Sequence, residues 1–254
     1  MPPLQDGRRR VRFYVLTRSA YGSAWSVEAN RRRLAVTRAV TAPSLRAQTD
    51  QGFEWIVLLH PADELLDERR EVFEGARFLY LDPDIDGTPA HVAWMAYRAG
   101  WAEAIGHRRE AVAMTRLDDD DALAPWAMER IRATAVRQTR RTALVLPNGL
   151  RVWRGRYTAV RHLSNAMQTL VTPPGDCMTV YDYKHRDVRQ FAAVRLVDPH
   201  LAWVWSRHDD AISGWRSSER PLTPALRALF PIDWSVFGSP VRQERGEPAG
   251  RYFR

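Results

Sequence analysis

The sequence predicts an α/β domain in which a mostly parallel central sheet is flanked by helices and followed by a mixed C-terminal half. Strand-like and helix-like segments alternate three times in the first half of the chain, and a fourth strand follows them. The second strand, residues 53–59 (FEWIVLL), is a continuous apolar run, typical of a strand buried on both faces of a parallel sheet. Beyond residue 140 the strand-like segments are short and separated by turn residues, which indicates a partly antiparallel arrangement.

Each element of the first half has its own pattern. β-branched and aromatic residues predict strands at residues 11–17, 53–59, 77–81 and 111–115. The spacing of apolar residues predicts a helix over residues 26–47, interrupted near Pro43, and a short charged helix over residues 63–73. A third helix is expected to begin at Thr88, with Pro89 at its first position.

The second half begins with a predicted helix over residues 123–140. Six short strands are expected after it, at residues 143–146, 150–153, 167–171, 178–181, 194–197 and 201–205. The residues from 240 onward are polar and are expected to form a loosely held tail. A length of 254 residues fits a single domain.

The composition narrows the class of protein. No apolar run approaches the roughly 18 residues that a membrane span needs, and residues 1–10 are polar and basic, with no hydrophobic stretch behind them that could serve as a signal peptide. Cys177 is the single cysteine, which excludes an intramolecular disulfide and a cysteine-based zinc site. A cytoplasmic location is therefore expected.

The basic residues are almost all arginine. Lys184 is the single lysine among 38 basic residues, and the formal charge is +8. This bias is typical of a GC-rich genome, but it also favours a surface that attracts nucleic acid, an anionic membrane or a sugar diphosphate. No nucleic-acid-binding motif surrounds the arginines, so we expect no nucleic-acid partner and leave open a peripheral association with an anionic membrane. The triplet Arg31-Arg32-Arg33 is expected to be a solvated helix face rather than a phosphate clamp.

Four consecutive aspartates, Asp118 to Asp121, directly follow the fourth predicted strand. Like charges this close repel one another, so either their pKa values rise or a cation holds them. Carboxylate oxygens suit Mg²⁺ or Mn²⁺, which bind through one or two carboxylates and the phosphates of a substrate. The alternative is a solvated acidic turn that caps the next helix. Because ligands of parallel sheets bind beyond the carboxyl ends of the strands, the sequence favours a metal and diphosphate site here.

Several stretches resemble the family-2 glycosyltransferases. Residues 39–49 (AVTAPSLRAQT) and 53–57 are similar to the family's first helix and second strand, and residues 116–123 (RLDDDDAL) resemble its Asp-x-Asp-Asp element. A narrower similarity, to the bacterial rhamnosyltransferase group, is carried by residues 16–18, 116–121, 147–149, 165, 169–171, 179–181, and Trp205 ahead of His208. The resemblance spans residues 12–215.

The resemblance implies a nucleotide-sugar-binding fold of the GT-A type. Residues 11–121 would form the nucleotide-sugar-binding half, residues 122–238 the acceptor and catalytic half, and residues 239–254 a tail. The implied reaction is the metal-dependent transfer of a sugar from a nucleotide-sugar donor to an acceptor hydroxyl, with inversion of the anomeric centre. The acceptor, whether a glycan, a lipid-linked molecule or a small molecule, is left open.

The resemblance also assigns residues to the donor site. Those expected to bind the nucleotide sugar are Thr17, Arg18, Asp63, Arg116, Asp118 and Asp119. Thr17 and Arg18 would lie near the base or its phosphates, Asp118 would meet the ribose or a metal-bound water, and Asp120 would ligate Mn²⁺ or Mg²⁺. Asp63 is the candidate substitute for an Asp-Asp pair that many relatives carry after the second strand, where this chain reads LHPAD.

An inverting transfer needs a carboxylate that deprotonates the acceptor hydroxyl. The resemblance puts this base well downstream of the metal motif, where Asp209 and Asp210 follow the last predicted strand, and either could serve. His208 would complete the metal shell. The alternative is a polar loop whose aspartates cap the next segment. Weaker candidates are His185, Asp176 and Asp182.

Two other classes of function stay open. A metal-dependent phosphatase acting on sugar phosphates has an Asp-x-Asp nucleophile that Asp118 and Asp120 imitate, although that motif usually follows a first strand rather than a fourth. A non-catalytic polyanion-binding protein would use the arginines and ignore the aspartates. A nicotinamide-dependent enzyme is disfavoured because the chain lacks a Gly-x-Gly-x-x-Gly segment.

Overall fold

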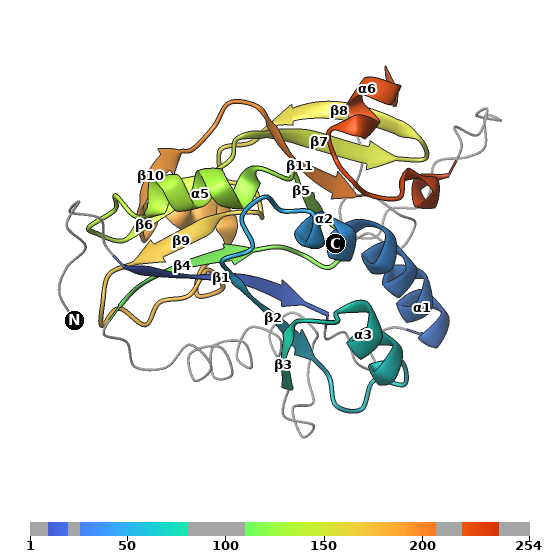
Figure 1. Ribbon diagram of the computed structural model, residues 1–254, viewed down its shortest axis with the longest axis horizontal. Coiled ribbons are helices and arrows are strands. Elements are labelled where there is room, and N and C mark those ends of the chain that lie inside the picture. The colour runs from blue at the N-terminus through green and yellow to red at the C-terminus, as the bar shows by residue number, and fades with distance from the viewer. Residues whose placement is uncertain (1–9, 20–25, 81–109, 207–219, 239–254) are drawn as a thin grey trace, which may run out of the picture.

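A computed structural model describes residues 10–19, 26–80, 110–206 and 220–238 of the chain. Two sheets carry the described strands, one of seven strands and one of five. Figure 1 shows the smaller sheet above the larger one, with helices packed beside both. Within these four ranges, no helix has the length and apolar character needed to cross a membrane.

The seven-stranded sheet forms the centre of the fold, with the order β10-β6-β9-β4-β1-β2-β3. Its strands are β1 (Val11–Arg18), β2 (Glu54–Leu59), β3 (Arg77–Tyr80), β4 (Ala111–Arg116), β6 (Thr142–Val145), β9 (Thr169–Thr172) and β10 (Ala193–Leu196). Six of these strands run in the same direction, and β9 runs antiparallel between β4 and β6. The start of β9 therefore lies at the same sheet edge as the carboxyl ends of β1, β2 and β4.

The five-stranded sheet has the order β12-β8-β7-β11-β5. Its strands are β5 (Ala122–Leu123), β7 (Asn148–Trp153), β8 (Arg156–Arg161), β11 (Leu201–Ser206) and β12 (Arg220–Pro221). Strand β11 is parallel to β7 and antiparallel to β5, where Trp203 pairs with Leu123. Because β5 directly follows the four aspartates, the two sheets meet next to them.

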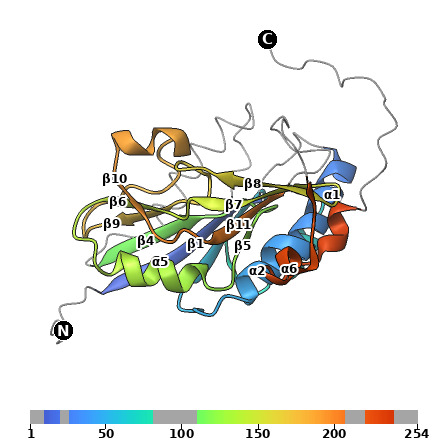
Figure 2. The ribbon, with the colours of Figure 1, turned by 90° about the horizontal axis from the view of Figure 1, so that it is seen from above.

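Helices cover one face of the larger sheet. They are α1 (Val27–Val36), the π-helix η2 (Thr37–Thr41), α2 (Ala42–Arg46), α3 (Leu66–Val72) and α5 (Ala127–Ala135). Their apolar side chains pack against alternate strand residues, including Val15, Val57 and Ala113. The neighbouring strand residues, such as Leu16 and Ile56, point to the opposite face, where the chain around residues 178–188 covers them. Figure 2 shows this layering, with α5 and α2 on one side of the sheet.

Three short helices complete the described chain. The 3₁₀ helix η3 (His185–Gln190) belongs to the segment that covers the second face, and Val188 is its buried anchor. Helix α6 (Pro224–Ala228) and the 3₁₀ helix η4 (Trp234–Phe237) pack with η2 and the five-stranded sheet around a third apolar cluster, which contains Val40, Val204 and Trp234. The C-terminal described segment thus closes over the junction between the two sheets.

The predicted fold class is confirmed, and most predicted elements are present. The four strands of the first half are observed. The helix over residues 26–47 is observed as α1, η2 and α2, and its regular α-helical pattern is interrupted by the π-helix η2 just before Pro43, near the predicted position. The helix expected at Thr88 and the tail from residue 240 lie outside the described residues.

Two predictions about the second half are wrong, and one strand was missed. Residues 178–181 form turns rather than a strand. The helix expected over residues 123–140 begins at Ala127, because Ala122 and Leu123 pair with β11 instead. Strand β8 was not predicted, since its residues are partly exposed and mostly polar or charged.

Candidate functional site

The four aspartates form a turn in which the carboxylates differ in exposure. The backbone N–H of Asp121 donates to the carbonyl oxygen of Asp118 at 3.2 Å. The side chains of Asp118 and Asp120 keep 20% and 12% of their surface exposed. As whole residues, Asp119, Asp120 and Asp121 are all buried, at 0%, 8% and 2% exposed. Asp118 and Asp120 are therefore the two carboxylates that can reach a ligand at the sheet edge.

Asp119 is held by two buried partners. The hydroxyl of Ser19 donates to its Oδ2 at 2.7 Å. The guanidinium of Arg33 donates to its Oδ1 through Nε at 2.8 Å and lies within 2.7 Å of it through Nη2. The same Nη2 lies 3.2 Å from Oδ1 of Asp120. Arg33 thus places a fixed positive charge between two of the four aspartates.

This position corrects one expectation from the sequence. Arg31 and Arg32 are exposed and lie near Glu28, as a solvated helix face requires. Arg33 is only 5% exposed and faces the aspartates. A signal was present in the sequence, because Asn30, Arg33 and Thr37 recur at the three- and four-residue spacing of a buried helix face.

Arg69, which the sequence did not single out, extends the buried network to the other side of Ser19. Its side chain is fully buried, and its Nε donates to Oδ2 of Asp63 at 2.7 Å. Its Nη1 donates to Ser19 Oγ at 2.8 Å, and its Nη2 donates to the side-chain oxygen of Asn30 at 3.2 Å. Asp63 also accepts a hydrogen bond from the backbone N–H of Leu65. The structure therefore places Asp63 inside an ion pair, linked to Asp119 through Arg69 and Ser19.

Asp118 has a different environment, on the outer side of the turn. Arg116 donates to both of its carboxylate oxygens, through Nε and Nη2, at 3.1 Å each. Burial opposes its ionisation, but the charges of Arg116, Arg18 and Arg33, together with the Arg116 hydrogen bond, outweigh burial and lower its pKa to about 2. Asp118 is therefore a carboxylate at neutral pH. Arg116 is supported from below by Tyr181, whose ring lies 5.0 Å from the guanidinium carbon.

Asp121 ties the motif to the second sheet. Its Oδ1 accepts a hydrogen bond from the backbone N–H of Ser206, the last residue of β11, at 3.0 Å. Burial and the negative charges of Asp120 and Asp118 raise its pKa well above the ordinary value of 3.8. Asp121 therefore joins the end of β11 to the aspartate turn.

Thr17 and Arg18 end strand β1 beside the motif. The hydroxyl of Thr17 is buried and accepts a hydrogen bond from Nε1 of Trp55 at 2.9 Å, so its side chain faces the core. Arg18 lies closer to the aspartates, because its charge contributes to the lowered pKa of Asp118. The nucleotide-binding roles of both residues stay predictions.

The donor set at the sheet edge suits a divalent cation that is completed by substrate phosphates. Asp118 and Asp120 are two carboxylates two residues apart that keep some exposure, and Mg²⁺ and Mn²⁺ prefer such oxygen donors. Among the described residues, no group of three or more His, Cys, Asp or Glu side chains could hold a metal by itself. His208, Asp209 and Asp210 lie outside the described residues, just after Ser206 in sequence.

The weaker candidates have other surroundings. Asp176 pairs with Arg141 at 2.7 Å beyond the far end of β9, at the edge opposite the aspartate motif, so it is not a base for this site. Asp182 accepts a hydrogen bond from the backbone N–H of Thr179. The ring of His185 lies 6.3 Å from that of His162, and burial lowers its pKa.

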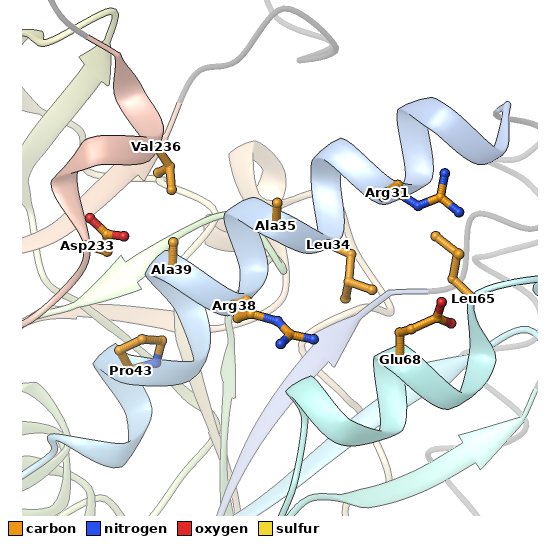
Figure 3. A pocket seen from close by; sticks show the side chains of 10 residues that line it. All are labelled: Arg31, Leu34, Ala35, Arg38, Ala39, Pro43, Leu65, Glu68, Asp233 and Val236. Atoms are coloured by element: carbon orange, nitrogen blue, oxygen red, sulfur yellow. The ribbon is translucent and has the colours of Figure 1, made fainter.

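A groove on the outer side of α1 lies apart from these residues. Its volume is about 420 Å³. Figure 3 shows Leu34 and Arg38 of the helical segment facing Leu65 and Glu68 near α3, with Asp233 at the other end. None of the predicted site residues lines this groove, so it has no part in the site at the sheet edge.

The described site belongs to a recognised class of enzyme. A mostly parallel sheet whose carboxyl edge presents an aspartate motif is the GT-A-like arrangement that the resemblance implied, and the protein is a glycosyltransferase. The family model described as "Putative rhamnosyl transferase" matches residues 26–220, and the chain belongs to that family. No curated protein matches it.

Solved structures with a similar fold are distant in sequence. TarS from S. aureus is 10% identical, with a TM-score of 0.42, over 77% of this chain and 37% of that protein. The protein described as "putative nucleotide-diphospho-sugar transferase" from Desulfovibrio desulfuricans G20 is 12% identical, with a TM-score of 0.41, over 78% of this chain and 82% of that one. A 4-diphosphocytidyl-2C-methyl-D-erythritol synthase is 12% identical, with a TM-score of 0.40, over 76% and 91%.

Proposed function

We propose that this glycosyltransferase moves a sugar from a nucleoside diphosphate sugar to an acceptor hydroxyl, with a divalent cation at Asp120 and with inversion at the anomeric carbon. The observation that carries the proposal is the uneven exposure of the aspartate turn at the carboxyl edge: the side chains of Asp118 and Asp120 keep 20% and 12% of their surface exposed, while Asp119 and Asp121 are almost fully buried. A solvated acidic turn would not bury two of its four carboxylates among arginine, serine and backbone partners.

In this reaction the acceptor oxygen forms a bond to the anomeric carbon as the bond from that carbon to the diphosphate breaks. The acceptor proton passes to a carboxylate, for which Asp209 and Asp210 are the candidates, and the electron pair leaves with the diphosphate. A bound Mg²⁺ or Mn²⁺ would neutralise the charge that develops on the diphosphate. Asp118, ionised at neutral pH, would accept hydrogen bonds from the ribose or from a metal-bound water.

The test of the metal assignment is calorimetry with a nucleoside diphosphate and Mn²⁺ on Asp120→Asn. The change removes one charged ligand and leaves the Asp119 network in place, so we expect metal-dependent nucleotide binding to be lost while the fold is kept. Asp67→Asn is the matched control, because Asp67 is an exposed aspartate on α3. Unchanged affinity in Asp120→Asn would end the claim that this residue ligates the metal.

The test of the base is turnover in Asp209→Asn, Asp210→Asn and the double variant. Loss of a general base lowers turnover by roughly 10²–10⁴-fold, while donor binding should persist. His208→Ala should instead weaken metal-supported donor binding. A product that retains the donor's anomeric configuration by NMR, or near-normal turnover in the double variant, would refute the inverting mechanism with this base.

The donor and the membrane contact each have a direct test. Because the family description names rhamnosyl transfer, a nucleoside diphosphate rhamnose belongs first in a panel of nucleotide sugars assayed for diphosphate release. We propose a cytoplasmic enzyme, and the formal charge of +8 favours a peripheral contact with an anionic membrane. Co-sedimentation with anionic and neutral vesicles would test that contact, and equal binding to both would contradict it.

A further inference from the structure

We propose that Arg33 is a positioning residue that acts as the resting counter-charge of the aspartate motif: it fixes Asp119 and screens Asp120 until a divalent cation displaces it from Asp120. This inference rests on the proposed function, because it takes Asp120 to be a metal ligand. It adds a residue on helix α1 that the aspartate motif itself does not contain.

The contact with Asp119 is the permanent one. Two nitrogens of Arg33 lie 2.7 and 2.8 Å from Oδ1 of Asp119, and the side chains of Arg33 and Asp119 are only 6% and 0% exposed. Ser19 satisfies the other oxygen of Asp119, and Arg69 donates to Ser19 from the far side. Removing either partner of a buried ion pair leaves an uncompensated charge, so this pair anchors the turn to α1.

The contact with Asp120 is the replaceable one. It uses Nη2, the nitrogen already engaged by Asp119, and at 3.2 Å it is longer than the 2.7 Å contact with Asp119. Asp120 also retains some exposure, so a cation can approach it from solvent. A metal ion and a guanidinium would both draw on the charge of this carboxylate, and each therefore weakens the hold of the other.

The arginine side chain suits this double role better than lysine does. A guanidinium is always charged and presents several N–H donors in a rigid plane, so it can hold one carboxylate and touch its neighbour. A lysine side chain is shorter overall and ends in a single ammonium group, which would reach only one of the two carboxylates. Arg33→Lys therefore separates the charge of Arg33 from its geometry.

The experiment measures Mn²⁺ binding to the full chain without nucleotide, by the loss of the free Mn²⁺ signal in electron paramagnetic resonance. The main variant is Arg33→Met with Asp119→Asn, which removes both members of the buried pair and keeps the net charge of the cluster. We expect its Mn²⁺ affinity to rise about tenfold, the size of one charge-assisted hydrogen bond, while turnover falls because the turn is no longer anchored. Arg32→Met is the matched control, because Arg32 is an exposed arginine on the same helix, and it should change neither quantity.

A rise in Mn²⁺ affinity together with a fall in turnover distinguishes this role of Arg33 from a merely structural role. Loss of a merely structural residue would lower both quantities. The gain in affinity should disappear when Asp120→Asn is added, and Arg33→Lys, which leaves every carboxylate in place, should give a smaller loss of turnover. Unchanged or weaker Mn²⁺ binding in the Arg33 and Asp119 double variant, with a thermal transition that shows a folded chain, would overturn the inference. If Asp120→Asn alone leaves Mn²⁺ binding unchanged, the proposed metal ligand fails instead, and the two failures are told apart.

Discussion

Gly149 is the position where the smallest change should have a large effect on stability. It lies in β7 directly over the indole ring of Trp203, which is fully buried in β11. A methyl group added at Gly149 would lie 2.5 Å from Cε2 of Trp203 and closer still to two further ring atoms, whereas ordinary contacts are 3.4–4 Å. Gly149→Ala therefore forces the ring to move, and a close-packed interior offers it little room.

The cost has two parts. Inserting a methyl group into a packed core costs about 1–3 kcal/mol. Nε1 of Trp203 donates to the carbonyl oxygen of Leu146 at 2.8 Å, and loss of that buried bond adds about 1 kcal/mol. We therefore expect Gly149→Ala to lower the free energy of unfolding by about 2–4 kcal/mol, and the melting temperature by roughly 4–16 °C for a chain of this size.

Urea denaturation followed by circular dichroism measures the change. Gly75→Ala is the control, because Gly75 has a φ of +86° and open space around it, so its cost comes from the backbone alone, at about 1 kcal/mol. Trp203→Leu should relieve the overlap, so the double variant should cost less than the sum of the single changes. A free energy of unfolding within 0.5 kcal/mol of the unmodified chain for Gly149→Ala would refute the reasoning.

Three further substitutions test the charged groups. Arg69→Met leaves the buried carboxylate of Asp63 without its ion-pair partner and should cost about 3–5 kcal/mol in urea denaturation, a loss that Asp63→Asn in the same chain should partly restore. Asp121→Asn should raise the melting temperature at pH 7 and have no effect near pH 3. Because the pKa of Asp121 is raised in the fold, its ionisation destabilises the folded state at pH values above the ordinary pKa of 3.8. The side-chain oxygen of Asn can still accept the hydrogen bond from the backbone N–H of Ser206. Asp118→Asn should show the opposite pH dependence. The lowered pKa of Asp118, about 2, means that its ionised carboxylate contributes about 2 kcal/mol to the free energy of unfolding above pH 4, and this contribution is lost as the pH falls toward 2. The unfolding curves of the variant and the unmodified chain should therefore converge in acid.

The parallel half of the fold could be predicted because its signals are local. The run FEWIVLL in β2 is apolar on both faces, and the structure buries both, one against the helices and one against the segment around residue 181. Residues 178–181 gave the same apolar signal for another reason. Val180 and Tyr181 are apolar because they pack over the second face of the sheet. The spacing of apolar residues alone cannot distinguish such a covering segment from a strand of the sheet.

The candidate site could be predicted in its chemistry but not in its partners. Four consecutive aspartates after a strand indicated a charged ligand site, and the structure puts them at the expected edge. Which carboxylates keep some exposure depends on the turn, and which arginine neutralises Asp119 depends on how α1 crosses the sheet. Arg33 is separated from Asp119 by 86 residues, so no local pattern could connect the two.

The antiparallel strand at the centre of the sheet has a consequence for synthesis on the ribosome. Thr115 of β4 and its partner Thr169 of β9 are 54 residues apart, and β4 reaches β6 and β10 only through β9. At about 5–20 residues per second, translation leaves the outer side of β4 without its partner for roughly 3–11 s. During that interval Val112 and Met114, buried in the finished protein, belong to an open strand edge, which other nascent chains can pair with. Chaperones that cover this edge, or a change in the pace of translation, should therefore alter the cellular yield of this enzyme.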